Sequence, residues 1–111
     1  MEKKKSLQRV ATELLDLFGL KGEHWIIGTL AKTKKEGKPV KPEDEKAGSW
    51  CLMGGLAKTG KLDQRNLLQQ AVSDYTEQAY YLIEEFNDSH HWVTIKKFLL
   101  KLAHPYQPRM K

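Results

Sequence analysis

Cys51, the only cysteine of the chain, is the residue whose type and setting are best suited to covalent chemistry. It lies in the segment GSWCLMGG, near the start of an expected helix, where the positive end of the helix dipole favours a thiolate. A thiolate is an effective nucleophile when an imidazole lies within hydrogen-bond reach and a polar side chain orients that ring. This combination would make the protein a cysteine-dependent hydrolase. The candidate imidazoles are those of His24, His90 and His91, and the candidate orienting groups are Asn87 and Asp88.

A packing role for Cys51 is the stronger interpretation. Its neighbours Trp50 and Leu52 are large and apolar, and a free cysteine usually behaves as a small, buried hydrophobic residue. The surrounding sequence also lacks the local signatures that accompany catalytic cysteines. We therefore expect a protein that is not an enzyme.

Metal and cofactor sites are not expected either. His90 and His91 are adjacent, but the chain has neither the CxxC nor the HExxH spacing of zinc ligands. The segment GGLAKTGK does not have the GxxxxGK[ST] register after a strand that cradles phosphates. The sequence thus predicts no metal and no cofactor.

Asn87 and Asp88 close a long predicted helix, where such side chains commonly satisfy exposed backbone groups. Gripping a ligand is the alternative role for this pair. The three tryptophans, Trp25, Trp50 and Trp92, could stack on bases or peptide, but in a small domain large aromatic residues more often build the core. We expect all five residues to be structural.

Length and composition indicate one small domain. The chain has 111 residues, of which 40% are hydrophobic and 30% are charged. We expect a single domain over residues 1–111, with flexible tails at 1–5 and 106–111. No apolar run approaches the roughly 20 residues of a membrane-spanning helix, and Glu13 and Asp16 argue against a secretory signal. These features predict a cytoplasmic protein with no membrane partner.

Positive charge is concentrated in the segment AKTKKEGKPVK, within a chain whose formal net charge is +5. Glu36 is the one acidic residue inside this segment, and the acidic run EDE follows at residues 43–45. Such a cluster can contact an acidic protein surface or the phosphates of a nucleic acid. The cluster contains no arginine, which counts against specific readout of bases. The candidate partner-binding residues are Lys32, Lys34, Lys35, Lys38 and Lys41.

A short β-hairpin is expected after the first helix. Residues 25–33 form its long arm and residues 38–41 its edge arm, with Gly37 in the turn. A two-stranded ribbon is marginal alone, so the hairpin must lean on helices. The side chains expected to make that contact are Trp25, Ile27 and Leu30.

Helical periodicity accounts for most of the remaining chain. Gly54 and Gly55 fall inside one predicted helix, where each costs up to about 1 kcal/mol relative to alanine, so we expect another backbone or helix to approach them closely. The predicted fold class is mainly α (α+β), with about four helices and one short β-hairpin between helices 1 and 2. The predicted helices are residues 6–18, capped by Ser6 and ended by Gly19; residues 47–58; residues 62–86; and residues 94–103, capped by Thr94 with Val93 packed on Phe98, and ended before Pro105.

The order of these landmarks resembles a small uncharacterised family found among bacterial and bacteriophage proteins. The likeness spans nearly the whole chain and departs at Gly55, where alanine is expected, and at residues 89–92, where a shorter link is expected. It implies helices plus a hairpin and a microbial or phage source, and no particular activity. The matching residues are Trp25, Gly28, Ala31, Gly37, Val40, Ala47, Trp50, Cys51, Gly54, Leu56, Phe86, Asn87, Asp88 and Thr94.

Two interpretations of function follow from the sequence. The first is a small non-catalytic binding protein whose basic hairpin contacts an acidic protein surface; its size and the family resemblance fit an inhibitor of a host system. The second is sequence-nonspecific nucleic-acid binding by the same lysines. The cysteine hydrolase is a distant third.

Overall fold

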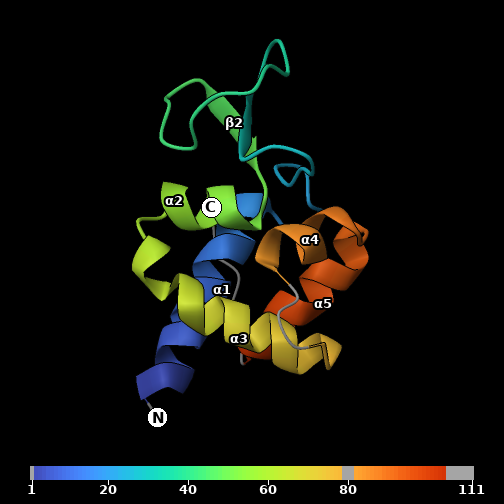
Figure 1. Cartoon of the computed structure of the whole chain (residues 1–111). Coiled ribbons are helices and arrows are strands. Elements are labelled where there is room, and N and C mark those ends of the chain that lie inside the picture. Colours follow the sequence, from blue (N-terminus) through green and yellow to red (C-terminus); the bar gives the residue numbers. More distant parts are fainter. Residues whose placement is uncertain (1, 79–81, 105–111) are drawn as a thin grey trace.

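The fold is mainly α with one small two-stranded hairpin, which confirms the predicted class (Figure 1). The computed structural model describes residues 2–78 and 82–104. Five α-helices and one 3-10 helix lie in this part of the chain. In chain order the elements are α1 (Glu2–Phe18), β1 (Ala31–Thr33), β2 (Ala47–Trp50), α2 (Leu52–Lys58), η1 (Leu62–Gln64), α3 (Arg65–Thr76), α4 (Ile83–Asp88) and α5 (Trp92–Leu102).

Helix α1 is the central element of the core and packs most extensively against α5. Its side chains at three- and four-residue steps are fully buried, and Gly19 ends it with a φ of 82°, as predicted. The helix begins at Glu2 and not at Ser6, so residues 2–5, predicted as a tail, are helical. Met1 and the predicted tail at 106–111 lie outside the described residues.

One cluster of buried apolar side chains draws on every α-helix and on both strands. Phe86 and Phe98 meet edge to face at its centre, with ring centroids 5.1 Å apart. The largest fully buried side chains are Phe18, Phe86, Phe98, Leu14, Leu15, Leu52, Leu56, Leu68, Ile83, Ile95, Leu99 and Val10.

The hairpin has a different second strand from the predicted one, and its first strand, β1, covers only the last three residues of the long arm predicted over 25–33. β1 pairs antiparallel with β2, with Ala31 opposite Trp50, whereas the predicted edge arm at 38–41 contributes an isolated bridge between Lys32 and Pro39. Pro39 and Pro42 lack the N–H groups that a continuous ladder requires, which limits the pairing of that arm.

The helix predicted over residues 47–58 begins only at Leu52, because residues 47–50 form β2. The main chain of Trp50 is occupied by the segment that follows α1: its N–H donates to His24 O (2.8 Å), and its carbonyl accepts from Ile26 N (3.1 Å). These bonds hold Trp50 in an extended conformation. Cys51 therefore lies at the N-cap and not inside the helix.

The single helix predicted over residues 62–86 is also wrong. α3 ends at Thr76, followed by Glu77 in the left-handed conformation (φ 57°), and α4 begins at Ile83. The side chain of Gln69 in α3 accepts a hydrogen bond from Ile83 N (3.0 Å), which satisfies a free amide at the start of α4. This bond joins α4 to α3.

The last helix, α5, begins at Trp92 with His91 as its N-cap, so the predicted cap at Thr94 is wrong. The carbonyl of His91 accepts from the N–H groups of Thr94 (3.0 Å) and Ile95 (3.3 Å), which places Thr94 inside the first turn. Val93 is 60% exposed and does not form the predicted apolar staple. Within the described ranges, no helix combines the length and apolarity needed to cross a bilayer.

Candidate functional site

The five lysines singled out in the sequence lie on one segment, residues 32–41, which we call the lysine ribbon. The lysine ribbon projects from the helical body together with β2 and the loop that precedes β2 (Figure 1). Lys32 is half-buried, whereas the other four lysines are exposed. Glu36, the one acidic residue of the ribbon, forms an ion pair with Lys38 (3.0 Å). Five lysines and one glutamate give this segment a formal charge of +4.

Gly54 holds the base of the ribbon against α2. A Cβ atom added at Gly54 would overlap the carbonyl oxygen of Leu30, the residue directly before β1. A Cβ atom at Gly55 would lie 2.7 Å from Cδ2 of Leu14 and 3.0 Å from Cζ of Phe18 in α1. The expected close approach to this glycine pair is thus confirmed. The absence of side chains here lets the ribbon and α1 contact α2 from two sides.

Trp50 anchors the other end of the lysine ribbon. Its indole is buried and donates a hydrogen bond to the carbonyl of Pro42 (2.9 Å), just beyond the last lysine. The ammonium group of Lys58 lies 5.8 Å from the centroid of the same ring. The loop that carries the lysines is therefore tied to the buried face of the fold.

Asn87 is the polar centre of the junction between the ribbon and the helices, and its side chain is completely buried. Its Oδ1 accepts from the indole of Trp25 (2.7 Å) and from Leu52 N (3.0 Å), the first residue of α2. Its Nδ2 donates to the carbonyl of Ile26 (3.1 Å) and to Oδ1 of Asp88 (2.9 Å). One amide group thereby links α4, α2 and the segment before β1.

Asp88 extends this network to the turn at Gly28. Its Oδ1 accepts from Gly28 N (3.1 Å), where the backbone has a φ of 85° that favours glycine. Asn87 and Asp88 therefore bond to the main chain of other segments, whereas the sequence predicted that they satisfy the end of their own helix. Among the motif residues of the sequence analysis, Trp25, Gly28, Trp50, Cys51, Gly54, Asn87 and Asp88 contribute to the junction through these contacts, whereas Thr94 lies in the first turn of α5.

Cys51 acts as the N-cap of α2. Its Sγ accepts a hydrogen bond from Gly54 N (3.3 Å), and its side chain is 95% buried. Burial raises the pKa of the Cys51 thiol, and the N–H groups of Gly54 and Met53 offset this effect only in part. The thiolate, which is the form of Cys51 that would act as a nucleophile, is consequently disfavoured.

Two of the three candidate histidines contact main-chain carbonyls. Nδ1 of His24 lies 2.9 Å from the oxygen of Gly48, and Nδ1 of His90 lies 2.9 Å from the oxygen of Phe86. His91 is exposed at the N-cap of α5. In the described part of the chain, no group of three or more His, Cys, Asp or Glu side chains is arranged to hold a metal ion.

We expect Cys51 to resist thiol reagents in the native protein and to react once the chain is unfolded, because its sulfur is buried and its pKa is raised. The measurement is the labelling rate with a chromogenic disulfide reagent, with and without denaturant. Rapid labelling of the native protein would contradict this assignment.

The raised pKa of the Cys51 thiol also makes the stability of the fold depend on pH. It stabilises the fold at pH values below the ordinary thiol pKa, and this contribution is lost as the pH rises toward the pKa of the folded state. The wild type should therefore lose more stability in alkaline solution than Cys51→Ser.

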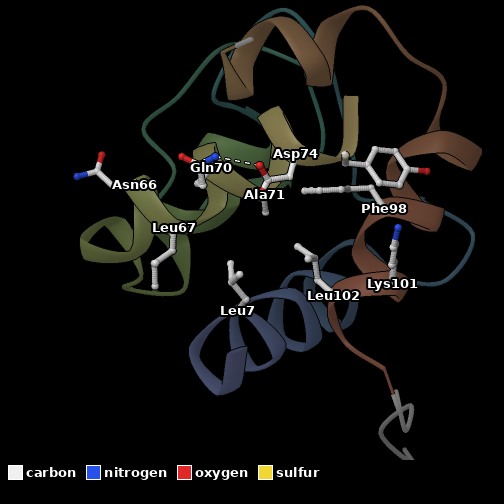
Figure 2. Close-up of a pocket in the computed structure, with 10 residues that line it drawn as sticks. Leu7, Asn66, Leu67, Gln70, Ala71, Asp74, Phe98, Lys101 and Leu102 are labelled. Atoms are coloured by element: carbon white, nitrogen blue, oxygen red, sulfur yellow. Dashed lines mark hydrogen bonds between the residues drawn. The ribbon is translucent and has the colours of Figure 1, made fainter. Parts of the chain in front are cut away.

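A groove of about 570 Å³ between α1, α3 and α5 was not anticipated from the sequence (Figure 2). Among the residues that the structure describes, its walls are mainly apolar and its charged lining residues are Asp74 and Lys101. Asp74 accepts from Gln70 (3.0 Å), and the ammonium of Lys101 lies 5.6 Å from the ring centroid of Tyr75. Both groups thus contact neighbours within the chain, and among the described lining residues their charges are opposite.

Comparison of this chain with protein-family models, with curated protein sequences and with solved structures finds no match.

Proposed function

We propose that this chain is a small non-catalytic binding protein of bacterial or phage origin that acts in the cytoplasm by contacting an acidic protein surface. The observation that carries the proposal is the lysine ribbon, which concentrates positive charge on a projection anchored at both ends. Its size and charge suit an inhibitor that covers a functional surface of a host protein.

The anchoring matters because binding costs conformational entropy when a flexible segment becomes ordered. Contacts to Leu30 at one end and Pro42 at the other restrict the ribbon before a partner arrives. The exposed lysines then steer association with an acidic surface and set its orientation. Lysine is a mobile point charge, which suits carboxylates at varied positions better than it suits the bidentate reading of bases.

A direct test is the affinity of the protein for a decaglutamate peptide. Lys34→Glu/Lys35→Glu should weaken binding by about tenfold or more, because two attractions become repulsions. Arg65→Glu/Lys97→Glu is the matched control, since both pairs are exposed and both changes lower the net charge from +5 to +1. The control should stay close to the wild type. Equal losses in both variants would show that net charge alone, and not the ribbon, determines binding.

Nucleic-acid binding by the same lysines is the second candidate, because exposed ammonium groups also neutralise phosphates. A gel-shift titration with single- and double-stranded DNA at low and raised salt detects it. Retardation that fades steeply with salt and disappears in Lys34→Glu/Lys35→Glu would favour this function. Absence of retardation at low salt would remove it.

A further inference from the structure

A hollow of about 330 Å³ lies at the base of the lysine ribbon. It is formed by the segment before β1, by β1 itself and by the connection between α4 and α5. The hollow is continuous with the ribbon through Lys32, which belongs to both. Its lining residues are Trp25, Ile26, Ile27, Lys32, His90 and His91.

The walls of this hollow are held in place by contacts behind them. The indole of Trp25 donates to Asn87, and its ring lies 5.7 Å from that of Trp92. The ring of His90 lies 4.8 Å from that of Phe86, and its Nδ1 contacts the Phe86 carbonyl (2.9 Å). A hollow whose walls are already fixed loses little entropy when it is filled.

The hollow combines two kinds of side chain. Its apolar lining includes Ile27, which leaves 48% of its surface exposed although it was expected to pack against the helices. Its polar lining includes Lys32, whose ammonium group attracts carboxylates, and the imidazoles of His90 and His91. The nearest acidic side chain in sequence, Asp88, is engaged by Gly28 and Asn87.

A concave site that combines exposed apolar area with a cationic side chain suits an anchor residue of a protein partner. Lys32 favours acidic residues beside the anchor, and the apolar lining favours the anchor itself. Leu30, another predicted packing residue, is also 47% exposed, directly before β1. Because Lys32 belongs to both, the lysine ribbon and the hollow adjoin each other.

We propose that the hollow receives one apolar side chain of the partner, flanked by aspartate or glutamate residues whose carboxylates meet Lys32. This inference rests on the proposed function and specifies the chemistry of the partner segment: acidic, with a single apolar anchor. The lysine ribbon then attracts the partner over a distance, and the hollow selects the segment that binds.

The test compares two ten-residue glutamate peptides, one with a central leucine and one with a central serine. The wild type should bind the leucine peptide about tenfold more tightly, as expected for partial burial of one leucine. Only the leucine peptide should shift the NMR signal of the Trp25 indole N–H. Ile27→Ser should reduce the affinity for the leucine peptide to that for the serine peptide, whereas Leu62→Ser, at a similarly exposed site (52%), should leave it unchanged.

The outcomes separate this inference from the function on which it rests. If the wild type binds both peptides equally and Lys34→Glu/Lys35→Glu weakens both, the ribbon stands and the hollow is not an anchor site. If neither peptide binds, the proposed function fails, and the inference fails with it. An unshifted Trp25 indole signal with the bound leucine peptide also overturns the inference.

Discussion

Replacing Asn87 by alanine is expected to lower the free energy of unfolding by about 3 to 5 kcal/mol, since each buried group left unpaired costs about 1 to 3 kcal/mol. The substitution removes the partners of the Trp25 indole, the Leu52 amide and the Ile26 carbonyl. These groups belong to two segments outside α4, the segment before β1 and the start of α2, so the loss is not local to α4. Urea unfolding followed by tryptophan fluorescence measures the change.

The control for this variant is Asn66→Ala, which changes an exposed asparagine of α3. A surface substitution of this kind should alter the free energy of unfolding by no more than about 0.5 kcal/mol. Equal, small effects of Asn87→Ala and Asn66→Ala would mean that the buried amide does not hold the junction together.

Gly54→Ala is expected to destabilise the protein by about 2 to 4 kcal/mol, although alanine favours a helix by up to about 1 kcal/mol over glycine. The added methyl group meets the carbonyl of Leu30, and a backbone atom cannot turn aside as a side chain can. Either α2 or the strand β1 must move. Thermal or urea unfolding gives the energy, and amide NMR shifts around Leu30 locate the displacement.

Gly55→Ala is the matched comparison within the same helix. Its methyl group meets the side chains of Leu14 and Phe18, which can adjust in part, so its cost should be lower, about 1 kcal/mol. The predicted order is thus Gly54→Ala worse than Gly55→Ala. The reverse order would show that α1, and not the base of the ribbon, approaches α2 most tightly.

Local sequence signals predicted the parts of the fold that depend on neighbouring residues. The spacing of apolar residues in α1 and the stop at Gly19 are such signals, and the paired glycines in α2 indicated a close contact. The strand β2 was missed because its pairing with β1 joins residues distant in the sequence, such as Ala31 and Trp50. Helical periodicity continues through residues 77–82, so it could not reveal the break that Gln69 and Glu77 mark.

The site, too, could be predicted where its signal is local, and not where it depends on residues distant in the sequence. The lysines are visible in the sequence as a cluster, and four of the five are exposed on the projecting ribbon. The partners of Asn87 were not visible, because Trp25 and Leu52 lie 62 and 35 residues away along the chain. The exposure of Ile27 was likewise hidden, since its type alone favours burial.

Affinity capture from a lysate of the source cells, followed by mass spectrometry, tests most directly whether the lysine ribbon recognises an acidic protein. The wild type and Arg65→Glu/Lys97→Glu should retain the same acidic partner, and Lys34→Glu/Lys35→Glu should lose it. Retention of that partner by all three proteins, at equal yield, would contradict the account.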